Sequence, residues 1–233
     1  MSEPLADEMT AKAAALELLA YCRARNWAGY DPYDALNSRV FRALPFLNFR
    51  LARLALTQGV KRSPVNLRPI LLVARTPNPK GVALFLSSVV RLSQSGAIEG
   101  GEDIRLLAGK LLALRSPGRL RPCWGYNFDW QQRHALVPKG SPNIICTTFA
   151  GNALLDAAAI SPDPSWSEAA LGAAEFILED LFSREGRESF FRYTLVTRDR
   201  IHNANLLGAA FLCRAGRLSG EKKYFEPALE AAR

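Results

Sequence analysis

The chain has 233 residues, 48% of them hydrophobic and 22% charged, which suits a globular protein with one substantial core or two small ones. Its formal net charge of +8 comes mostly from arginine, whose planar guanidinium binds carboxylates and phosphates, so an anionic partner is favoured. No compact Lys/Arg block, zinc-ligand spacing or RNA-binding signature accompanies the charge, which argues against a nucleic-acid partner.

The start of the chain and its cysteines indicate a cytoplasmic protein. Residues 1–12, MSEPLADEMTAK, are acidic where a signal peptide would be basic, and no apolar core follows. No stretch approaches the ~20 apolar residues of a membrane span. The four cysteines are widely spaced and form no CxxC pair, so we expect reduced thiols and no disulfide.

Helical patterns dominate the chain, and they alternate in kind. Residues 10–26 and 46–59 predict a first pair of helices. Residues 81–92 are apolar nearly all the way round, as a buried helix must be, whereas residues 102–116 carry one apolar stripe opposite charged residues. The sequence therefore predicts an inner helix followed by an outer, half-exposed one.

The same alternation returns twice, with a period near 60 residues. Residues 144–160 are apolar and small, and residues 165–182 are amphipathic, with Ser165 and Glu168 placed as a capping box. Residues 204–216 and 221–233 repeat the pair, and only TLVT at 194–197, beside FFRY, resembles a strand. We therefore predict an all-α fold in which helical hairpins stack into a solenoid or close into a ring.

An asparagine precedes each inner helix, at Asn78, Asn143 and Asn203. Asparagine is a favoured N-cap, so capping is the plainer interpretation of all three. In either geometry the inner helices run parallel, which gathers their N-termini and the preceding loops on one rim. Free N–H groups and a partial positive charge at that rim suit anionic or hydroxyl-rich ligands.

Two rim loops share a pattern of tryptophan, Gly-Tyr, an acidic residue and an arginine: WAGYDPYDALNSR at 27–39 and CWGYNFDWQQR at 123–133. Aromatic faces with carboxylates and arginines make a common carbohydrate site, and we predict the substrate-binding residues to be Trp124, Tyr126, Trp130, Tyr30, Arg133 and Arg200. The alternative is that the aromatic residues of the second loop are wedges that fill the rim.

Asp129 is the first candidate for an acid or base, because apolar neighbours would raise its pKa. Asp31 and Asp34 are candidates for the second carboxylate, although either could instead cap a helix beginning at Tyr33. Glycoside hydrolysis typically needs two carboxylates about 5 Å apart for retention, or ~6.5–9.5 Å apart for inversion. The sequence supplies candidate carboxylate pairs but does not give the distance between the two carboxylates.

His202 lies immediately before an inner helix, beside Asn203 and Asn205, which we count among the substrate-binding candidates. The histidine could act as an auxiliary base or simply hydrogen-bond a neighbouring loop. Neither histidine has a partner at metal-ligand spacing, and no Gly-rich nucleotide loop or GxSxG elbow is present. We therefore expect no metal and no cofactor.

Six segments together resemble a bacterial α/α-toroid family of the six-hairpin glycosidase-like group, often encoded among exopolysaccharide biosynthesis genes: WAGYDPYDALNS, KRSPVNLRP, NPKG, CWGYNFDWQ, PNIICTTFAGNALLDA and IHNANLLGAA. The resemblance implies an α/α toroid and a carbohydrate setting. Such toroids usually complete six hairpins, and about four are visible here. We therefore expect one domain over 1–233 with an incomplete ring, either a fragment or a family member shortened at the C-terminus. Its exposed apolar flanks favour a homodimer or missing sequence.

Two functions compete. The first is a carbohydrate-active protein acting on a bacterial, anionic polysaccharide or its oligosaccharides, with Asp129 and Asp31 or Asp34 as a glycosidase-like pair. The second is a non-catalytic module that binds a glycan or a partner protein in polysaccharide biosynthesis. Epimerase-like members of the wider group use a pair of histidines on inner helices, and only His202 is well placed, which counts against an epimerase.

Overall fold

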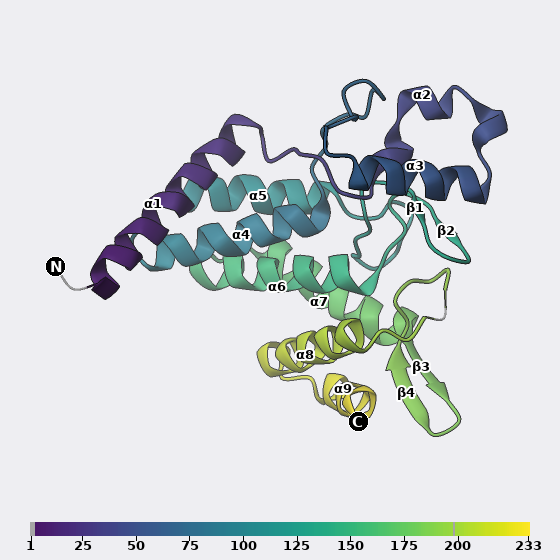
Figure 1. Cartoon of the computed structure of the whole chain (residues 1–233). Coiled ribbons are helices and arrows are strands. Elements are labelled where there is room, and N and C mark those ends of the chain that lie inside the picture. The colour runs from purple at the N-terminus through teal and green to yellow at the C-terminus, as the bar shows by residue number, and fades with distance from the viewer. Residues whose placement is uncertain (1–2, 198) are drawn as a thin grey trace.

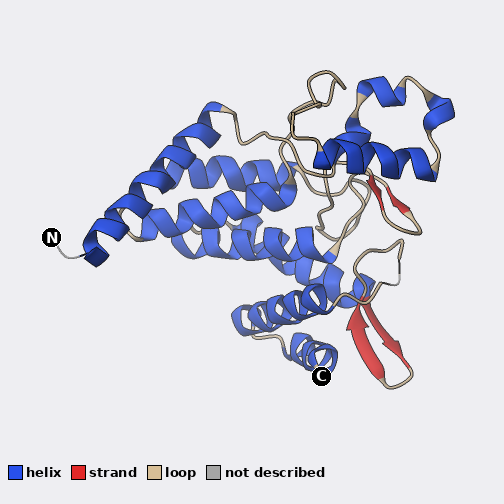
Figure 2. Ribbon diagram, viewed as in Figure 1, coloured by secondary structure: helices blue, strands red, loops and turns tan. Residues whose placement is uncertain are grey.

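The computed structural model describes the backbone of residues 3–197 and 199–233, and side chains from Thr10 onward. Figures 1 and 2 show a mostly helical chain. The helices are α1 (Glu3–Ala24), α2 (Arg39–Arg42), α3 (Arg50–Arg62), α4 (Pro79–Gln94), α5 (Gly101–Ala113), α6 (Ile144–Ile160), α7 (Pro164–Phe176), α8 (His202–Ser219) and α9 (Phe225–Ala232). Within the described ranges, no helix has both the length and the apolarity to cross a bilayer.

Three helical hairpins form the body of the molecule: α4 with α5, α6 with α7, and α8 with α9. Helix α6 packs between α4 and α8, and all three begin at the same end of the stack (Figure 1). Every predicted inner and outer helix is present, and α6 has the predicted bounds. The predicted repeat of inner and outer helices is confirmed for these three pairs, and so is the rim of gathered N-termini. The first predicted pair does not form a hairpin, because α1 and α3 lie on opposite sides of the molecule (Figure 1).

Small residues let the inner helices approach closely. A Cβ atom on Gly151 of α6 would lie 2.2 Å from the Phe211 ring of α8, so the ring occupies the space that a side chain would need. Ala150, Ala153 and Ala157 of α6 are also fully buried. Close packing of this kind explains why residues 144–160 are both apolar and small.

Two of the three asparagines are caps. The Asn78 side chain accepts a hydrogen bond from the Lys80 N–H at the start of α4, and Asn143 accepts one from the Cys146 N–H at the start of α6. Asn203 is not a cap, because α8 begins one residue earlier, at His202. The capping box at Ser165 is also wrong, since Asp163 caps α7 and Pro164 is its first residue.

The strands lie outside TLVT, which corrects the prediction for that segment. Thr194 accepts hydrogen bonds from the Val196 and Thr197 N–H groups, so the chain turns there. The strands form two antiparallel hairpins, β1 (Trp130–Gln131) with β2 (Leu136–Val137) and β3 (Phe182–Glu185) with β4 (Glu188–Phe191). Helix α7 runs into β3 through a π turn, Ile177–Leu181.

Candidate functional site

A hollow of about 510 Å³ opens at the rim, beside the start of α4. Its walls come from three rim loops and α4, and they include six aromatic rings. The polar groups that reach it include one carboxylate, one amide and one ammonium group, from Asp31, Asn78 and Lys80. The rim hollow thus combines a mostly aromatic wall with a few polar groups, as ligand sites typically do.

Aromatic contacts fix the wall of the rim hollow. Tyr126 stacks on Phe128, with ring centres 5.1 Å apart and planes at 11°, and meets the edge of Trp130 at 5.9 Å. Trp130 packs in turn against Tyr193, at 5.7 Å, and the Tyr126 and Tyr193 hydroxyls are hydrogen-bonded at 2.9 Å. The wall is therefore preorganised by ring–ring packing rather than assembled by a ligand.

A close backbone approach places Tyr126 in this wall. Gly125 pairs with Pro142, and a Cβ atom on Gly125 would lie 2.0 Å from the Ser141 carbonyl oxygen. The Asn143 N–H donates to the Trp124 carbonyl at 2.9 Å, which ties the same loop to the start of α6. Only glycine permits this contact, and it explains the glycine before Tyr126.

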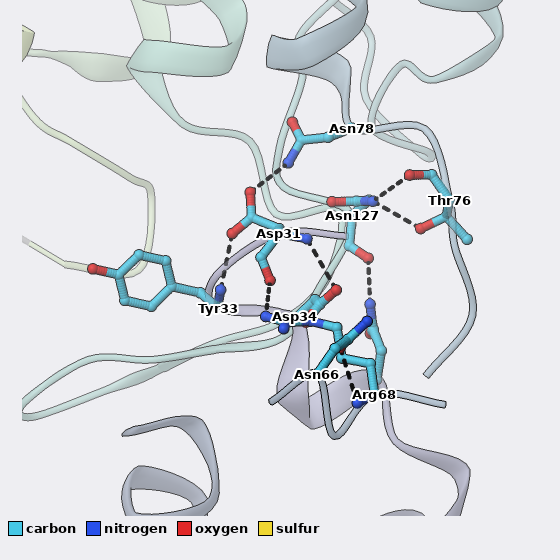
Figure 3. Close-up of polar contacts among 9 residues, drawn as sticks. Asp31, Tyr33, Asp34, Asn66, Arg68, Thr76, Asn78 and Asn127 are labelled. Atoms are coloured by element: carbon cyan, nitrogen blue, oxygen red, sulfur yellow. Dashed lines mark hydrogen bonds and ion pairs between the residues drawn. The ribbon is translucent and has the colours of Figure 1, made fainter. Parts of the chain in front are cut away.

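Asp31 is the carboxylate of the rim hollow, and Figure 3 shows its contacts. It accepts hydrogen bonds from the Tyr33 N–H at 3.0 Å and from the Asn78 side-chain amide at 3.3 Å. Burial raises the pKa of Asp31 above its ordinary value, while the Tyr33 N–H opposes that rise. Lys80 also opposes it, less strongly. A carboxyl group with a raised pKa, facing a hollow, is a plausible proton donor.

Asp34, three residues on, has a structural role. Its carboxylate is buried, lies 2.7 Å from the Arg68 guanidinium and accepts the Asp31 N–H at 3.0 Å. Arg68 also donates to the Asp31 carbonyl at 2.7 Å (Figure 3). Asp34 therefore braces the loop that presents Asp31 and begins a 3-10 turn, Asp34–Asn37, rather than facing a ligand.

The burial of Asp31 predicts a pH-dependent stability. For an acid whose pKa is raised by folding, the penalty is fully present above the folded pKa and vanishes below the unfolded value near 3.8. Asp31→Asn removes the charge while keeping the shape. Urea unfolding from pH 7 to pH 4 should show the wild-type protein gaining stability relative to this variant, at about 1.4 kcal/mol per unit of pKa difference. A pH-independent difference would contradict this assignment.

Trp124 belongs to the core rather than to the rim hollow. Its side chain is fully buried, and its indole N–H donates to the Leu111 carbonyl at 2.7 Å. Tyr126 and Trp130 are half-buried and line the hollow. Trp124 is therefore a wedge, whereas the two later rings line the rim hollow, where a ligand platform would have to lie.

Asp129 lies in a different, smaller hollow of about 240 Å³. It accepts the Lys139 N–H at 2.7 Å and is 3.5 Å from the Arg42 guanidinium, and no second acidic side chain lines that hollow among the described residues. Arg133 is exposed between β1 and β2, outside both hollows. Tyr30 does line the rim hollow, with Asp31.

The remaining candidates gather at the β4–α8 edge. Arg200, His202 and Asn205 line a third hollow, of about 690 Å³. Arg200 is ion-paired with Glu185 and Glu188, and Asn205 accepts the Phe191 N–H at 2.8 Å and donates to the Ala231 carbonyl. Asn203 is exposed and lines none of the three hollows. The structure therefore brings together Tyr30, Asp31, Tyr126 and Trp130 at the rim hollow and groups Arg200, His202 and Asn205 at a separate one. The other candidates lie outside both: Trp124, Asp34, Asp129, Arg133 and Asn203.

Sequence reasoning did not place Tyr33, Lys80 and Tyr193 in a site, although all three line the rim hollow. Lys80 lies two residues after the capping Asn78 in NPKG, so its position at the start of an inner helix could have been predicted from the sequence. Its ammonium lies 5.0 Å from the Phe149 ring centre and forms no ion pair with any residue in the described ranges. No three His, Cys, Asp or Glu side chains within those ranges could together hold a metal ion.

No protein-family model and no curated protein matches this chain. A solved structure of cellobiose 2-epimerase from Bacillus thermoamylovorans is similar over 88% of this chain and 60% of its own length, with a TM-score of 0.53 and 10% identity. A D-mannose isomerase is also similar, with a TM-score of 0.49 and 15% identity, over 87% of this chain and 59% of its own length. A family 76 glycoside hydrolase (mannosidase) from Bacteroides thetaiotaomicron has a TM-score of 0.46 and 11% identity, over 66% of this chain and 43% of its own length.

The chain spans less than two thirds of the length of each of these structures. At such low identity the likeness to the epimerase concerns the fold alone. It confirms the all-α prediction: this chain has the α/α-toroid fold.

Proposed function

We propose that the protein is carbohydrate-active and binds a saccharide in the rim hollow. The observation that carries this proposal is the preorganised wall of Tyr126 and Trp130 facing Asp31 at the start of an inner helix. Sugar rings offer apolar faces that stack on aromatic rings and hydroxyls that bond to carboxylates and amides. Similarity to an epimerase that acts on cellobiose supports the same ligand class.

The saccharide is anionic in this proposal. Lys80 brings a positive charge to the rim hollow without an ion-pair partner in the described ranges, so it is free to meet a sugar carboxylate. A bacterial exopolysaccharide or its oligosaccharides is the setting that the family resemblance implies.

Asp31 is the acid or base if the protein turns its ligand over. Its raised pKa makes it a better proton donor than an ordinary aspartate. A paired-carboxylate hydrolysis lacks support, because Asp34 is buried against Arg68 and Asp129 lies in another hollow. This same observation favours a second candidate, non-catalytic glycan recognition, in which Asp31 only binds hydroxyls.

Calorimetric titration with neutral and uronic-acid oligosaccharides tests the proposal. We expect saturable binding of a uronic-acid oligosaccharide that survives ~0.5 M salt, where charge screening is strong. Trp130→Ala should weaken binding about tenfold or more through lost stacking. Arg133→Ala is the control, because this exposed residue lies outside the rim hollow.

Reducing-end assays for cleavage, together with chromatography for isomerised products of the same ligands, separate turnover from recognition. If Asp31 is a general acid or base, Asp31→Asn should lower turnover by roughly 10²–10⁴-fold. Absence of turnover alongside tight binding would favour the recognition module. Absence of saturable binding by every oligosaccharide would contradict both.

A further inference from the structure

The positive charge of the chain is concentrated in one segment. Residues 35–98 contain ten Lys or Arg residues and no Asp or Glu. The chain has 30 basic and 22 acidic residues, so 20 basic and 22 acidic residues remain outside this segment. Eight of the ten lie within 39–75, which we name the basic projection because α2, α3 and their loops stand away from the helical hairpins (Figure 1).

Several of these charges have no structural partner. Arg39, Arg50 and Arg62 are exposed and form no ion pair with any side chain in the described ranges. Arg39 and Arg50 are the first residues of α2 and α3, where a positive charge opposes the helix dipole. Helix stability therefore does not explain either residue.

The basic projection also exposes large apolar side chains. In the turn between α2 and α3, Phe46 is 73% exposed and Phe49 51%, and Leu51, the second residue of α3, is 67% exposed. This turn forms the outer end of the projection, away from the hairpins (Figure 1). Neighbouring apolar and basic side chains on a protruding turn differ from an ordinary solvated surface, where charge of both signs is mixed.

We propose that the basic projection docks on an anionic phospholipid bilayer. Exposed Phe and Leu side chains enter the boundary between headgroups and acyl chains, while arginines pair with lipid phosphates and carboxylates. A nucleic acid would satisfy the arginines but would leave Phe46, Phe49 and Leu51 without an apolar partner. An anionic bilayer offers partners for both the arginines and the exposed apolar side chains, and we therefore favour it.

Docking would also hold the rim hollow near the membrane. The Lys61 ammonium of α3 lies 4.1 Å from the centre of the Tyr33 ring, and Arg68 braces Asp34. These contacts tie the basic projection to the loop that carries Asp31. The inference itself rests on charge and exposure, and it is independent of what the rim hollow binds.

Vesicle flotation tests the inference. The full chain should float with phosphatidylcholine vesicles containing about 30% phosphatidylserine and not with phosphatidylcholine alone. The triple variant Arg39→Gln, Arg50→Gln, Arg62→Gln should partition about a hundredfold more weakly, at about fivefold per charge. The control, Arg91→Gln, Arg105→Gln, Arg217→Gln, removes three exposed arginines outside the basic projection and should bind as the wild type does.

The apolar contribution needs its own pair of variants. Phe46→Ser, Phe49→Ser, Leu51→Ser should lose the binding that persists at ~0.5 M salt, whereas Leu106→Ser, Leu120→Ser, Leu218→Ser, exposed elsewhere, should not. Equal flotation of the two arginine variants would overturn the proposal. So would unaltered binding of the Phe46 variant together with displacement by DNA, because the site would then recognise any polyanion.

Discussion

Arg68→Met is expected to lower the free energy of unfolding by about 3 kcal/mol, because it leaves the buried Asp34 carboxylate without its cation. The variant also loses the hydrogen bond from Arg68 to the Asp31 carbonyl. Both contacts join the loop at 63–75 to the loop that carries Asp31. Urea unfolding followed by circular dichroism measures the loss.

Arg62→Met is the matched control, since Arg62 is exposed at the end of α3 and unpaired within the described residues. Its stability should stay within about 0.5 kcal/mol of the wild type. A loss below 1 kcal/mol for Arg68→Met would mean that Asp34 is not held as a buried ion, and the brace beneath Asp31 would lose its support.

Trp124→Ala is expected to cost about 3–5 kcal/mol, the range for removing a large ring from a packed core. The ring is fully buried, and its loss also leaves the Leu111 carbonyl without the indole donor. The change should appear as a lower urea midpoint with an unchanged slope.

Trp130→Ala tests whether Trp130 lines a binding site or, like Trp124, fills the core. Because Trp130 is half-buried, we expect a smaller loss of stability than for Trp124→Ala, together with the loss of saccharide affinity. Were the two variants to lose equal stability, Trp130 would be a second wedge, and the aromatic wall would be structural.

Helices were predictable because burial leaves a local pattern. The apolar, small run at 144–160 became α6 residue for residue, and Asn78 and Asn143 cap their helices through contacts two or three residues away. A prediction from local sequence failed where another residue or another hydrogen bond competed for the same role. Asp163 before Pro164 outcompeted Ser165 as a cap, and the Thr194 hydroxyl bonded to its own turn rather than leaving TLVT in a strand.

The site was less predictable because its environment comes from distant residues. Asp129 was expected among apolar neighbours, yet its partners are Arg42 and the Lys139 backbone. The Asp34 carboxylate is bound by Arg68, 34 residues farther along the chain, and does not line the rim hollow. Lys80 reaches the rim hollow from α4 and Tyr193 from the loop between β4 and α8, so no single stretch of sequence contains the site.

Tryptophan fluorescence tests the central claim most directly, because the chain has four tryptophans and three of them, Trp27, Trp124 and Trp166, are buried. Trp130 is half-buried, so acrylamide should quench mainly this residue. We predict that a uronic-acid oligosaccharide shields Trp130 saturably and that a Trp130→Phe variant loses the accessible signal. Quenching that stays unchanged while calorimetry reports binding would place the ligand elsewhere and contradict the assignment of the rim hollow.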